Sequence, residues 1–285
     1  MTIAIGDMFK FRNICGALVS ADTQIVATDL ATKTGGKMHL SLSRGETYTK
    51  AFGIADAAED GEAAKMLANE ITSALCADTV QNMNQVVGIL KSKMTEWYAA
   101  YGQNRPPSTQ FVFAAAVGGS CELFYCSPPN TVLPKNEPFA VGQGARPIEP
   151  LFPSLPAFSQ PSAESALLRT AYWMYRAKRD EGSMCGGPTA IFMISQYGKA
   201  APFGGQEVKA AEELGAEVDE LLQQCRYSVL NGTSEQEQRS VLGDFSNSYL
   251  ALAAKARDIA FPTLQWLEGT SWATQSASQK SEPAQ

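Results

Sequence analysis

The spacing of apolar residues changes along the chain, and this change limits the possible folds more than any other feature. Up to about residue 58, apolar and polar residues alternate, as in half-buried strands. At Asp60, a residue type that often caps helices, the period becomes helical and stays so to about residue 101. Strand patterns then return. Two adjacent amphipathic helices need a surface to cover, and the preceding strands supply one.

Hairpins are predicted on both sides of these helices. Residues 14–32 read as two strands with a turn at residues 21–23, and residues 35–55 as a second hairpin with its turn at 43–46. Residues 2–10 show a further alternation. A third hairpin is predicted at residues 111–127, with its turn at Gly118 and Gly119. A short strand at 139–141 follows.

Five helices are predicted from apolar stripes at helical spacing. They cover residues 60–76, 83–101, 162–180, 205–230 and 234–259, and a fully apolar strand follows the third. This order predicts an α+β fold, a four-layer αββα sandwich of two antiparallel sheets flanked by helices. We expect one sandwich domain over residues 1–205, a C-terminal helical extension over 206–268 that packs on it, and a flexible polar tail over 269–285.

Charge and composition narrow the classes of partner. The net charge is −6 and the charged residues are interspersed, so we expect binding to neither nucleic acid nor an anionic membrane. The longest apolar runs are too short to span a bilayer, and the N-terminus lacks a signal-peptide pattern. A cytoplasmic protein is therefore predicted.

The sequence shows no pattern typical of a metal or cofactor site. The six cysteines include no CxxC pair, and the only histidine is His39, so the spacing of a zinc site is absent. His39 alternates with its apolar neighbours and is predicted to be a surface strand residue rather than a catalytic base. No G-x-S-x-G motif accompanies it. We expect neither a metal nor an organic cofactor.

The second residue offers a nucleophile of another kind. If Met1 is removed, as is common before a small residue, the chain begins at Thr2, and its α-amino group can act as a base for its own hydroxyl. A nearby lysine, Lys37, can keep that amine neutral, and Asp29 can orient the lysine. This arrangement would make Thr2 a nucleophile built from a single residue.

Several stretches between residues 13 and 200 resemble the N-terminal nucleophile (Ntn) hydrolases, and specifically their proteasome β-subunit-like branch. Residues 25–32 resemble the strand that carries an aspartate, at Asp29, with Ala31 where the family has arginine. Residues 37–42 resemble the lysine-headed strand that follows, at Lys37. Residues 51–60 resemble a glycine-containing turn that leads into the first large helix, at Gly53. The opening MTIAIG is similar to the start of bacterial proteasome-like proteins.

Two glycine turns extend this resemblance. Residues 139–152 resemble a Gly-Ser-Gly turn, with Gln143 in the place of the serine. Residues 171–195 resemble the end of a helix, a Ser-Gly-Gly turn and a strand, with Cys185 in the place of the serine and Asp180 as a match to a nearby aspartate. The resemblance implies an Ntn hydrolase fold and assembly as a homo-oligomer, either a ring or a dimer. It also implies a peptide or small amide as the substrate.

The resemblance also implies a role for each matched residue. Thr2 would attack the carbonyl, Lys37 would tune the nucleophile, and Asp29 would hold Lys37 in place. The backbone N–H of Gly53 would stabilise the oxyanion. Asp180, Cys185, Gln143 and Cys15 are secondary candidates for the site.

The N-terminal segment leaves alternatives open, because Asp29 lies 27 positions after Thr2 and the family has a shorter separation. If residues 7–14 form a bulge or a longer first hairpin, Thr2 can still lie beside Lys37. If residues 1–12 form an arm ahead of the first strand, the protein would be a non-catalytic proteasome-like ring or scaffold subunit. In a third alternative, autoproteolysis before Cys15 would expose a cysteine nucleophile.

Overall fold

A computed structural model gives the fold and describes residues 3–26, 32–34, 38–44, 49–77, 79–101, 104, 106–154, 162–182, 185–231 and 234–268. Within these residues, two five-stranded antiparallel sheets face each other. The first sheet has the spatial order β10 (Phe139–Gly142), β1 (Ile3–Phe11), β2 (Ile14–Asp22), β11 (Thr189–Ser195) and β12 (Lys199–Pro202). The second has the order β5 (Met38–Arg44), β6 (Thr49–Ala58), β7 (Thr109–Val117), β8 (Ser120–Ser127) and β9 (Thr131–Pro134). A separate pair joins β3 (Gln24–Val26) to β4 (Thr32–Thr34).

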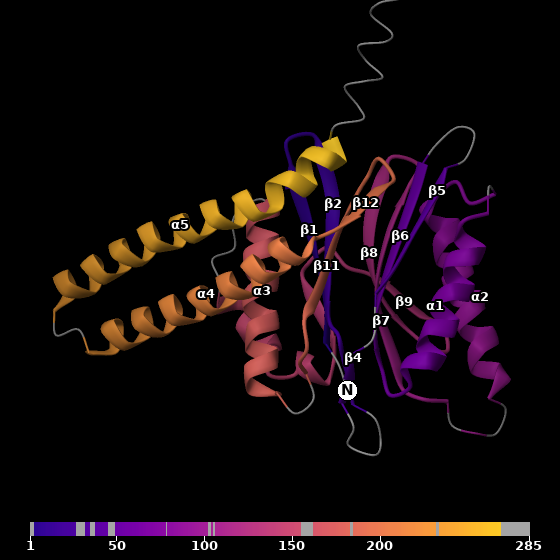
Figure 1. Cartoon of the computed structure of the whole chain (residues 1–285), viewed down its shortest axis with the longest axis horizontal. Coiled ribbons are helices and arrows are strands. Elements are labelled where there is room, and N and C mark those ends of the chain that lie inside the picture. Colours follow the sequence, from indigo (N-terminus) through magenta and orange to yellow (C-terminus); the bar gives the residue numbers. More distant parts are fainter. Residues whose placement is uncertain are drawn as a thin grey trace, which may run out of the picture.

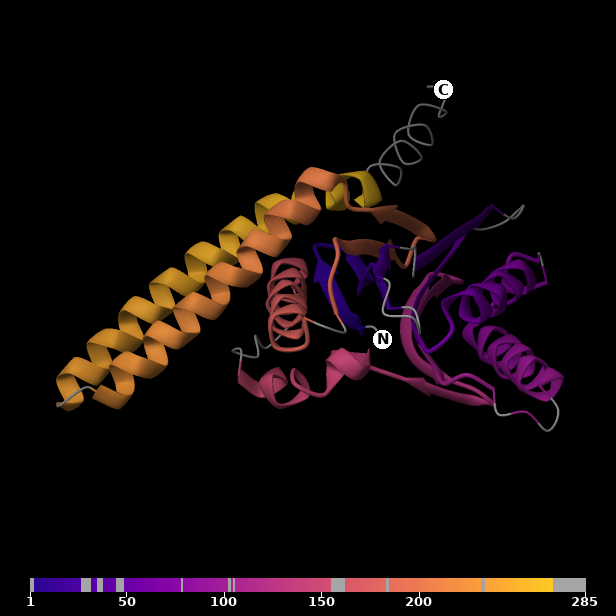
Figure 2. The ribbon, with the colours of Figure 1, turned by 60° about the horizontal axis from the view of Figure 1, so that its bottom comes forward.

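Helices cover both outer faces of this sandwich (Figure 1). The second sheet is covered by α1 (Gly61–Leu75) and α2 (Met83–Ala100), and the first by α3 (Ala163–Asp180). Short 3-10 turns, η1 (Gln143–Ala145) and η2 (Glu149–Ser154), lie between β10 and α3. Two long helices, α4 (Gly205–Asn231) and α5 (Glu235–Glu268), pack on α3 and extend beyond the sandwich as a hairpin (Figure 2). The predicted four-layer α+β sandwich is confirmed.

Local sequence explains where these helices begin. Asp60 accepts hydrogen bonds from the backbone N–H groups of Glu62 and Ala63, as a residue before a helix can do for unpaired donors. Asn82 and Gln85 form a reciprocal capping box at the start of α2. Ser162 caps α3. The predicted starts of these three helices are therefore confirmed.

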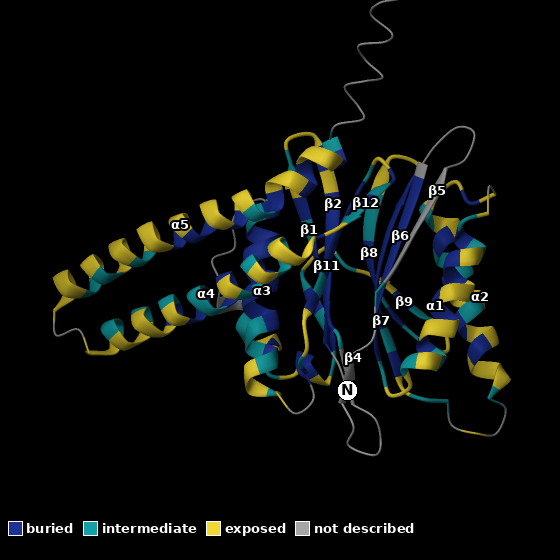
Figure 3. Cartoon of the chain, viewed as in Figure 1, coloured by how far each residue is buried: buried dark blue, intermediate teal, exposed yellow. Residues whose placement is uncertain are grey.

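Small residues allow the two sheets to approach closely. The buried cluster between them is rich in alanine, and it contains Ala4, Ala17, Ala21, Ala51, Ala55, Ala114 and Ala116. A Cβ atom at Gly53 would lie only 2.3 Å from the ring of Phe192 on the opposite sheet. Larger apolar side chains fill the two outer layers, between each sheet and its helices. Figure 3 shows that strands β1, β2 and β7 are largely buried.

The first hairpin differs from the prediction. Strand β2 pairs with β1 and β11, so the hairpin predicted within residues 14–32 is wrong, and the partner of β2 precedes it in the sequence. Residues 3–11 form strand β1, which is paired on both sides by β10 and β2. The N-terminal arm is therefore also wrong, and the longer first hairpin is confirmed.

Other differences lie further along the chain. Helix α5 continues to Glu268, nine residues past the predicted end, and includes Pro262. Strands β9 and β12 have four residues each, too few to show a clear alternation, and were not predicted. The predicted tail beyond residue 268 lies outside the described residues. Among the helices that the structure describes, none has the length and apolar character needed to cross a membrane.

Candidate functional site

The start of β1 is held by a buried carboxylate. The β1–β2 register pairs Ala4 with Ala21 and so brings Ile3 beside Asp22 at the same end of the hairpin. The backbone N–H of Ile3 donates to Asp22 Oδ1 over 3.0 Å, and that of Gly186 donates to Asp22 Oδ2 over 3.1 Å. Asp22 is fully buried. One carboxylate therefore joins the residue after Thr2 to the turn that precedes β11.

Two glycine turns, distant in sequence, meet at this end of β1. Gly142 of β10 pairs directly with Ile3. A Cβ atom at Gly144 would lie 2.5 Å from Cys185 Sγ and 2.9 Å from Ile3 Cβ, so only glycine fits between them. The predicted GQG and CGG turns are thus brought together around the first residue of the strand.

The second of these turns is supported by a polar cluster beneath α3 and α4. Lys178 Nζ donates to Gly187 O, Thr189 Oγ1 and Glu212 Oε1, each over 2.7 Å. Thr189 also donates to Glu212 through its backbone N–H over 2.9 Å. Burial works to raise the pKa of Glu212, but the hydrogen bonds from Lys178 and Thr189 prevail and lower it. The turn that donates to Asp22 is therefore anchored by charged hydrogen bonds.

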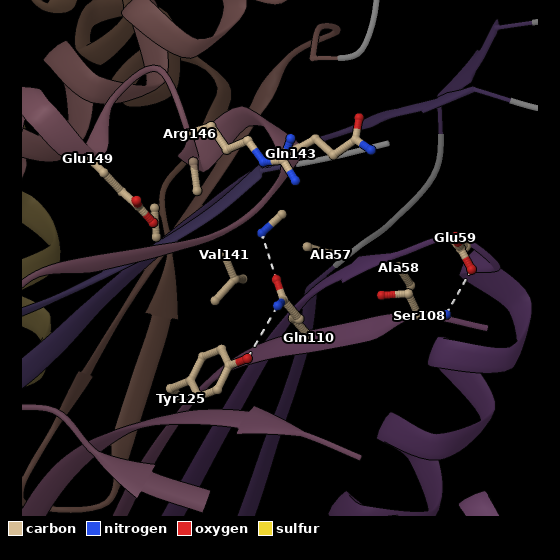
Figure 4. A pocket seen from close by; sticks show the side chains of 13 residues that line it. Ala57, Ala58, Glu59, Ser108, Gln110, Tyr125, Val141, Gln143, Arg146 and Glu149 are labelled. Atoms are coloured by element: carbon tan, nitrogen blue, oxygen red, sulfur yellow. Dashed lines mark hydrogen bonds between the residues drawn. The ribbon is translucent and has the colours of Figure 1, made fainter. Parts of the chain in front are cut away.

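A cleft of about 520 Å³ opens at the edge strand β10, beside the residue that pairs with Ile3. Figure 4 shows its walls, which come from the end of β6, the start of β7, β8, β10 and η1. Its lining residues include Glu59, Gln110, Tyr125, Gln143, Arg146 and Glu149. The cleft is polar and lies where the two sheets meet at the start of β1.

A hydrogen-bonded chain crosses from one sheet to the other at this cleft. The backbone N–H of Gly142 donates to Gln110 Oε1 over 3.0 Å. Gln110 Nε2 donates in turn to Tyr125 Oη over 3.2 Å (Figure 4). Gln110, on β7 of the second sheet, thereby fixes Gly142, the residue at the end of β10 that pairs with Ile3.

Three of the four predicted catalytic residues, Thr2, Asp29 and Lys37, lie outside the described residues. Gly53 is described, and it lies inside β6, paired with Leu40 of β5 and Ala114 of β7. The predicted glycine-containing turn is therefore wrong. Close packing against Phe192 is the observed reason for glycine at this position.

The secondary candidates divide into two groups. Gln143 lines the cleft, and Cys185 lies buried against Gly144, so both belong to the site. Asp180 instead pairs with Arg176 and Arg179 at the end of α3. Although burial works to raise the pKa of Asp180, the hydrogen bonds from these two arginines lower it.

Cys15 lies at the far end of the first hairpin from Asp22. It pairs with Lys10, whereas Asp22 adjoins the pair Ala4 and Ala21. Its backbone N–H donates to Gln196 Oε1 over 3.3 Å. The structure does not bring Cys15 together with the two glycine turns.

Asp22 is a functional candidate that the sequence analysis does not identify. The hairpin predicted within residues 14–32 places Asp22 in its turn. The signal was present in the alternation of residues 2–10, which identifies an earlier strand able to pair with β2. Elsewhere in the part of the chain that the structure describes, no group of three or more histidine, cysteine or acidic side chains is placed to hold a metal ion.

Comparison with known proteins gives relatives at the level of structure. No protein-family profile and no curated protein sequence matches the chain. A mutant of Anbu from Hyphomicrobium sp. strain MC1 superposes with a TM-score of 0.61 and 18% identity, covering 78% of this chain and 96% of the other. Anbu from Yersinia bercovieri, described as an ancestral β-subunit, gives a TM-score of 0.60 and 14% identity, covering 78% of this chain and 97% of the other.

These comparisons correct the family assignment suggested by the sequence. The chain resembles proteasome-like proteins in fold, but membership in the proteasome β-subunit-like Ntn hydrolases is not upheld. No family profile matches, and the two structural neighbours described above share only 18% and 14% identity with the chain. What is shown is a proteasome-like sandwich fold related to that of Anbu.

Proposed function

We propose that this chain is an N-terminal threonine hydrolase that cleaves peptide or other amide bonds, with Thr2 as the nucleophile after removal of Met1. The main support is the hydrogen bond from Ile3 N to Asp22 Oδ1, which fixes the first described residue beside a buried carboxylate. Thr2 is bonded to Ile3, so its Cα lies within about 3.8 Å of Ile3 Cα. Gly142, the strand partner of Ile3, lines the cleft beside β10.

Asp22 is proposed as the carboxylate that organises the nucleophile, in preference to Asp29. Its two oxygens accept from Ile3 and Gly186, so its position is fixed by backbone groups from two separate segments. Lys37 remains the proposed cation that favours a neutral amine and a reactive hydroxyl on Thr2. The chemistry then uses the amine, hydroxyl and charges of the chain itself.

We also propose that the protein acts as a homo-oligomer. Its structural neighbour from Yersinia bercovieri is described as a β-subunit. In this chain the outer ends of α4 and α5 expose Tyr227, Leu230 and Leu242, which are between 53% and 84% accessible. A mass measured by light scattering at micromolar concentration is expected to exceed that of one chain, and a monomer would contradict this part of the proposal.

Variants at Thr2 test the proposed nucleophile. Thr2→Ala should lose at least about three orders of magnitude in the rate of peptide hydrolysis, because the attacking hydroxyl is absent. Thr2→Ser should retain activity, since it keeps both hydroxyl and amine. Intact mass must show Met1 removed in each protein that is compared.

Three further variants separate the alternatives. Asp22→Asn should lose peptide hydrolysis, and Asp29→Asn should retain it. The reverse result would identify Asp29 as the carboxylate that organises the nucleophile. Cys15→Ala should leave activity unchanged. Equal rates for Thr2→Ala and the parent protein would remove the hydrolase proposal and favour a non-catalytic subunit.

A further inference from the structure

The hydrogen bonds at the floor of the cleft fix the direction of one phenolic proton. A backbone N–H such as that of Gly142 can only donate, so the side-chain oxygen of Gln110 must face it. The amide nitrogen of Gln110 therefore faces Tyr125 and donates to its oxygen. Tyr125 Oη is an acceptor in this bond, and its own proton remains to be donated. No acceptor for that proton lies among the described residues.

A second donor, Arg146, lies on the other side of the same cleft. Figure 4 shows Arg146 beside Gln143, across the cleft from Gln110 and Tyr125. Arginines elsewhere in the chain, such as Arg169 and Arg257, are paired with carboxylates. Within the part of the chain that the structure describes, Arg146 makes no such pair. Its guanidinium is therefore available to an anionic ligand.

Carboxylates limit the charge of that ligand. Glu59 and Glu149 also line the cleft, and Figure 4 shows them away from the space between Arg146 and Tyr125. Glu59 is engaged by the backbone N–H of Ser108 over 2.8 Å. Two carboxylates in the lining of one cleft disfavour a multiply charged anion such as phosphate more than they disfavour a single carboxylate.

The strand beside the cleft can hold an extended chain. β10 is the edge strand of its sheet. The N–H of Gly142 points away from β1, toward Gln110, and residues two apart in a strand direct their backbone groups to the same side. The backbone groups of Ala140 therefore face the cleft that this residue lines. Such an edge is able to pair with a peptide in an extended conformation.

We propose that this cleft binds an extended peptide through its carboxylate, with Tyr125 Oη and the guanidinium of Arg146 as the donors. The proposal rests on the proposed hydrolase, because it identifies the substrate of that site as a peptide with a carboxylate near the bond to be cleaved. A C-terminal carboxylate and an acidic side chain offer the same chemistry. The two sources are separated by experiment.

Binding can be measured independently of catalysis in the full-length Thr2→Ala variant, since this protein should not consume the probes. The probes are acetyl-Ala-Ala-Ala with a free C-terminus, its C-terminal amide, acetyl-Ala-Glu-Ala-amide and acetyl-Ala-Gln-Ala-amide. Titration by calorimetry should show at least one carboxylate probe binding about tenfold more tightly than its matched amide. The pair that shows the preference identifies the source of the carboxylate.

Single substitutions then assign the preference to the two donors. Tyr125→Phe keeps the ring, which packs edge-on against Phe139, and removes only the hydroxyl. Tyr125→Phe and Arg146→Gln should each reduce the carboxylate preference by about threefold or more. Arg226→Gln, at an exposed arginine on α4, should leave it unchanged. Circular dichroism confirms that each variant is folded.

Three outcomes would overturn the proposal. These are equal affinity for carboxylate and amide probes, no binding of any probe at millimolar concentration, and a preference that survives both substitutions. Each of these is separate from the failure of the hydrolase proposal, which is measured by turnover in the protein that retains Thr2. A carboxylate preference in an inactive protein would support the cleft as a binding site alone.

Discussion

Helices cover both sheets, but the side chains buried beneath them differ between the two halves of the sandwich. Under α1 and α2 the layer is mainly apolar, with residues such as Phe52, Leu67 and Phe113. Lys50 of β6 is also fully buried on this side of the sandwich, and its Nζ donates to Ala77 O just past the end of α1. Under α3, an ion pair lies inside the layer, where Arg169 donates to Asp7 Oδ2 through Nε and Nη2 over 2.9 and 2.7 Å. The strand that carries Asp7 is β1, which begins beside Thr2.

We infer from this contrast that the two sheets have different roles. Apolar packing under α1 and α2 tolerates small changes in geometry, because its contribution to stability is proportional to the apolar area removed from water. A buried ion pair contributes little net stability but fixes one geometry. Removing only one of its two partners is strongly destabilising, because the other charge stays buried and unpaired. We therefore infer that Asp7 and Arg169 hold β1 in one position against α3, which the site at the end of β1 requires.

The largest effect is expected from breaking this ion pair on one side. Arg169→Met should lower the free energy of unfolding by about 3–5 kcal/mol near neutral pH, because Asp7 would be left buried without its cation. Urea unfolding measures the change. Arg257→Met removes a more exposed ion pair with Glu164, 2.9 Å long, and should cost less than about 1 kcal/mol. Equal losses in the two variants would contradict the distinction between the layers.

The same pair gives a pH signature. Burial raises the pKa of Asp7 from 3.8 to about 6, although the charge and hydrogen bonds of Arg169 act in the opposite direction. Between these values the folded protein binds more protons than the unfolded protein, so this group makes stability fall as pH rises through about 4 to 6. The expected change is about 3 kcal/mol for a shift of this size.

Asp7→Asn supplies the control for that signature. Asparagine does not titrate, so the fall in unfolding free energy between pH 4 and 6 that Asp7 contributes should be absent from this variant. The comparison uses urea unfolding of both proteins at each pH. If the parent protein gains stability relative to Asp7→Asn as pH rises through this window, the buried, raised pKa of Asp7 is contradicted.

A smaller effect is expected where the two halves meet. Gly53→Ala should lower the free energy of unfolding by about 1–3 kcal/mol, because the added Cβ would press on the buried ring of Phe192. Gly88→Ala, in the apolar half, adds a Cβ to α2 with no atom within 4 Å, and should raise stability by about 0.5–1 kcal/mol. Thermal unfolding of both variants checks the two signs. A neutral Gly53→Ala would mean that close packing of the sheets does not require glycine.

The apolar half is also the half that sequence predicts best. Helices α1 and α2 were identified with correct starts, because Asp60 and Asn82 are strong capping residues and the apolar stripe follows each directly. The hairpins β5–β6 and β7–β8 were identified by alternation and by the turns between their strands. Neighbouring strands in this sheet follow one another in strand order, and local patterns identified all of them except the four-residue β9.

The other half depends on pairings that local patterns do not reveal. Strand β2 lies between β1 and β11, and β11 follows it by more than 160 residues. Asp22 was read as part of a turn because its contacts, Ile3 and Gly186, come from two distant segments. Gln143 and Cys185 were identified by resemblance. The cleft that Gln143 lines, and the contact between Cys185 and Gly144, became visible only in the fold.

The most direct test of the central claim is the site of covalent modification by an electrophilic β-lactone. After incubation of the full-length protein, intact mass and peptide mapping should show one adduct, on Thr2, in chains that have lost Met1. The adduct should be absent from Thr2→Ala and reduced in Asp22→Asn. Retention of Met1, or an adduct on another residue with Thr2 unmodified, would contradict the assignment of Thr2 as the nucleophile at the start of β1.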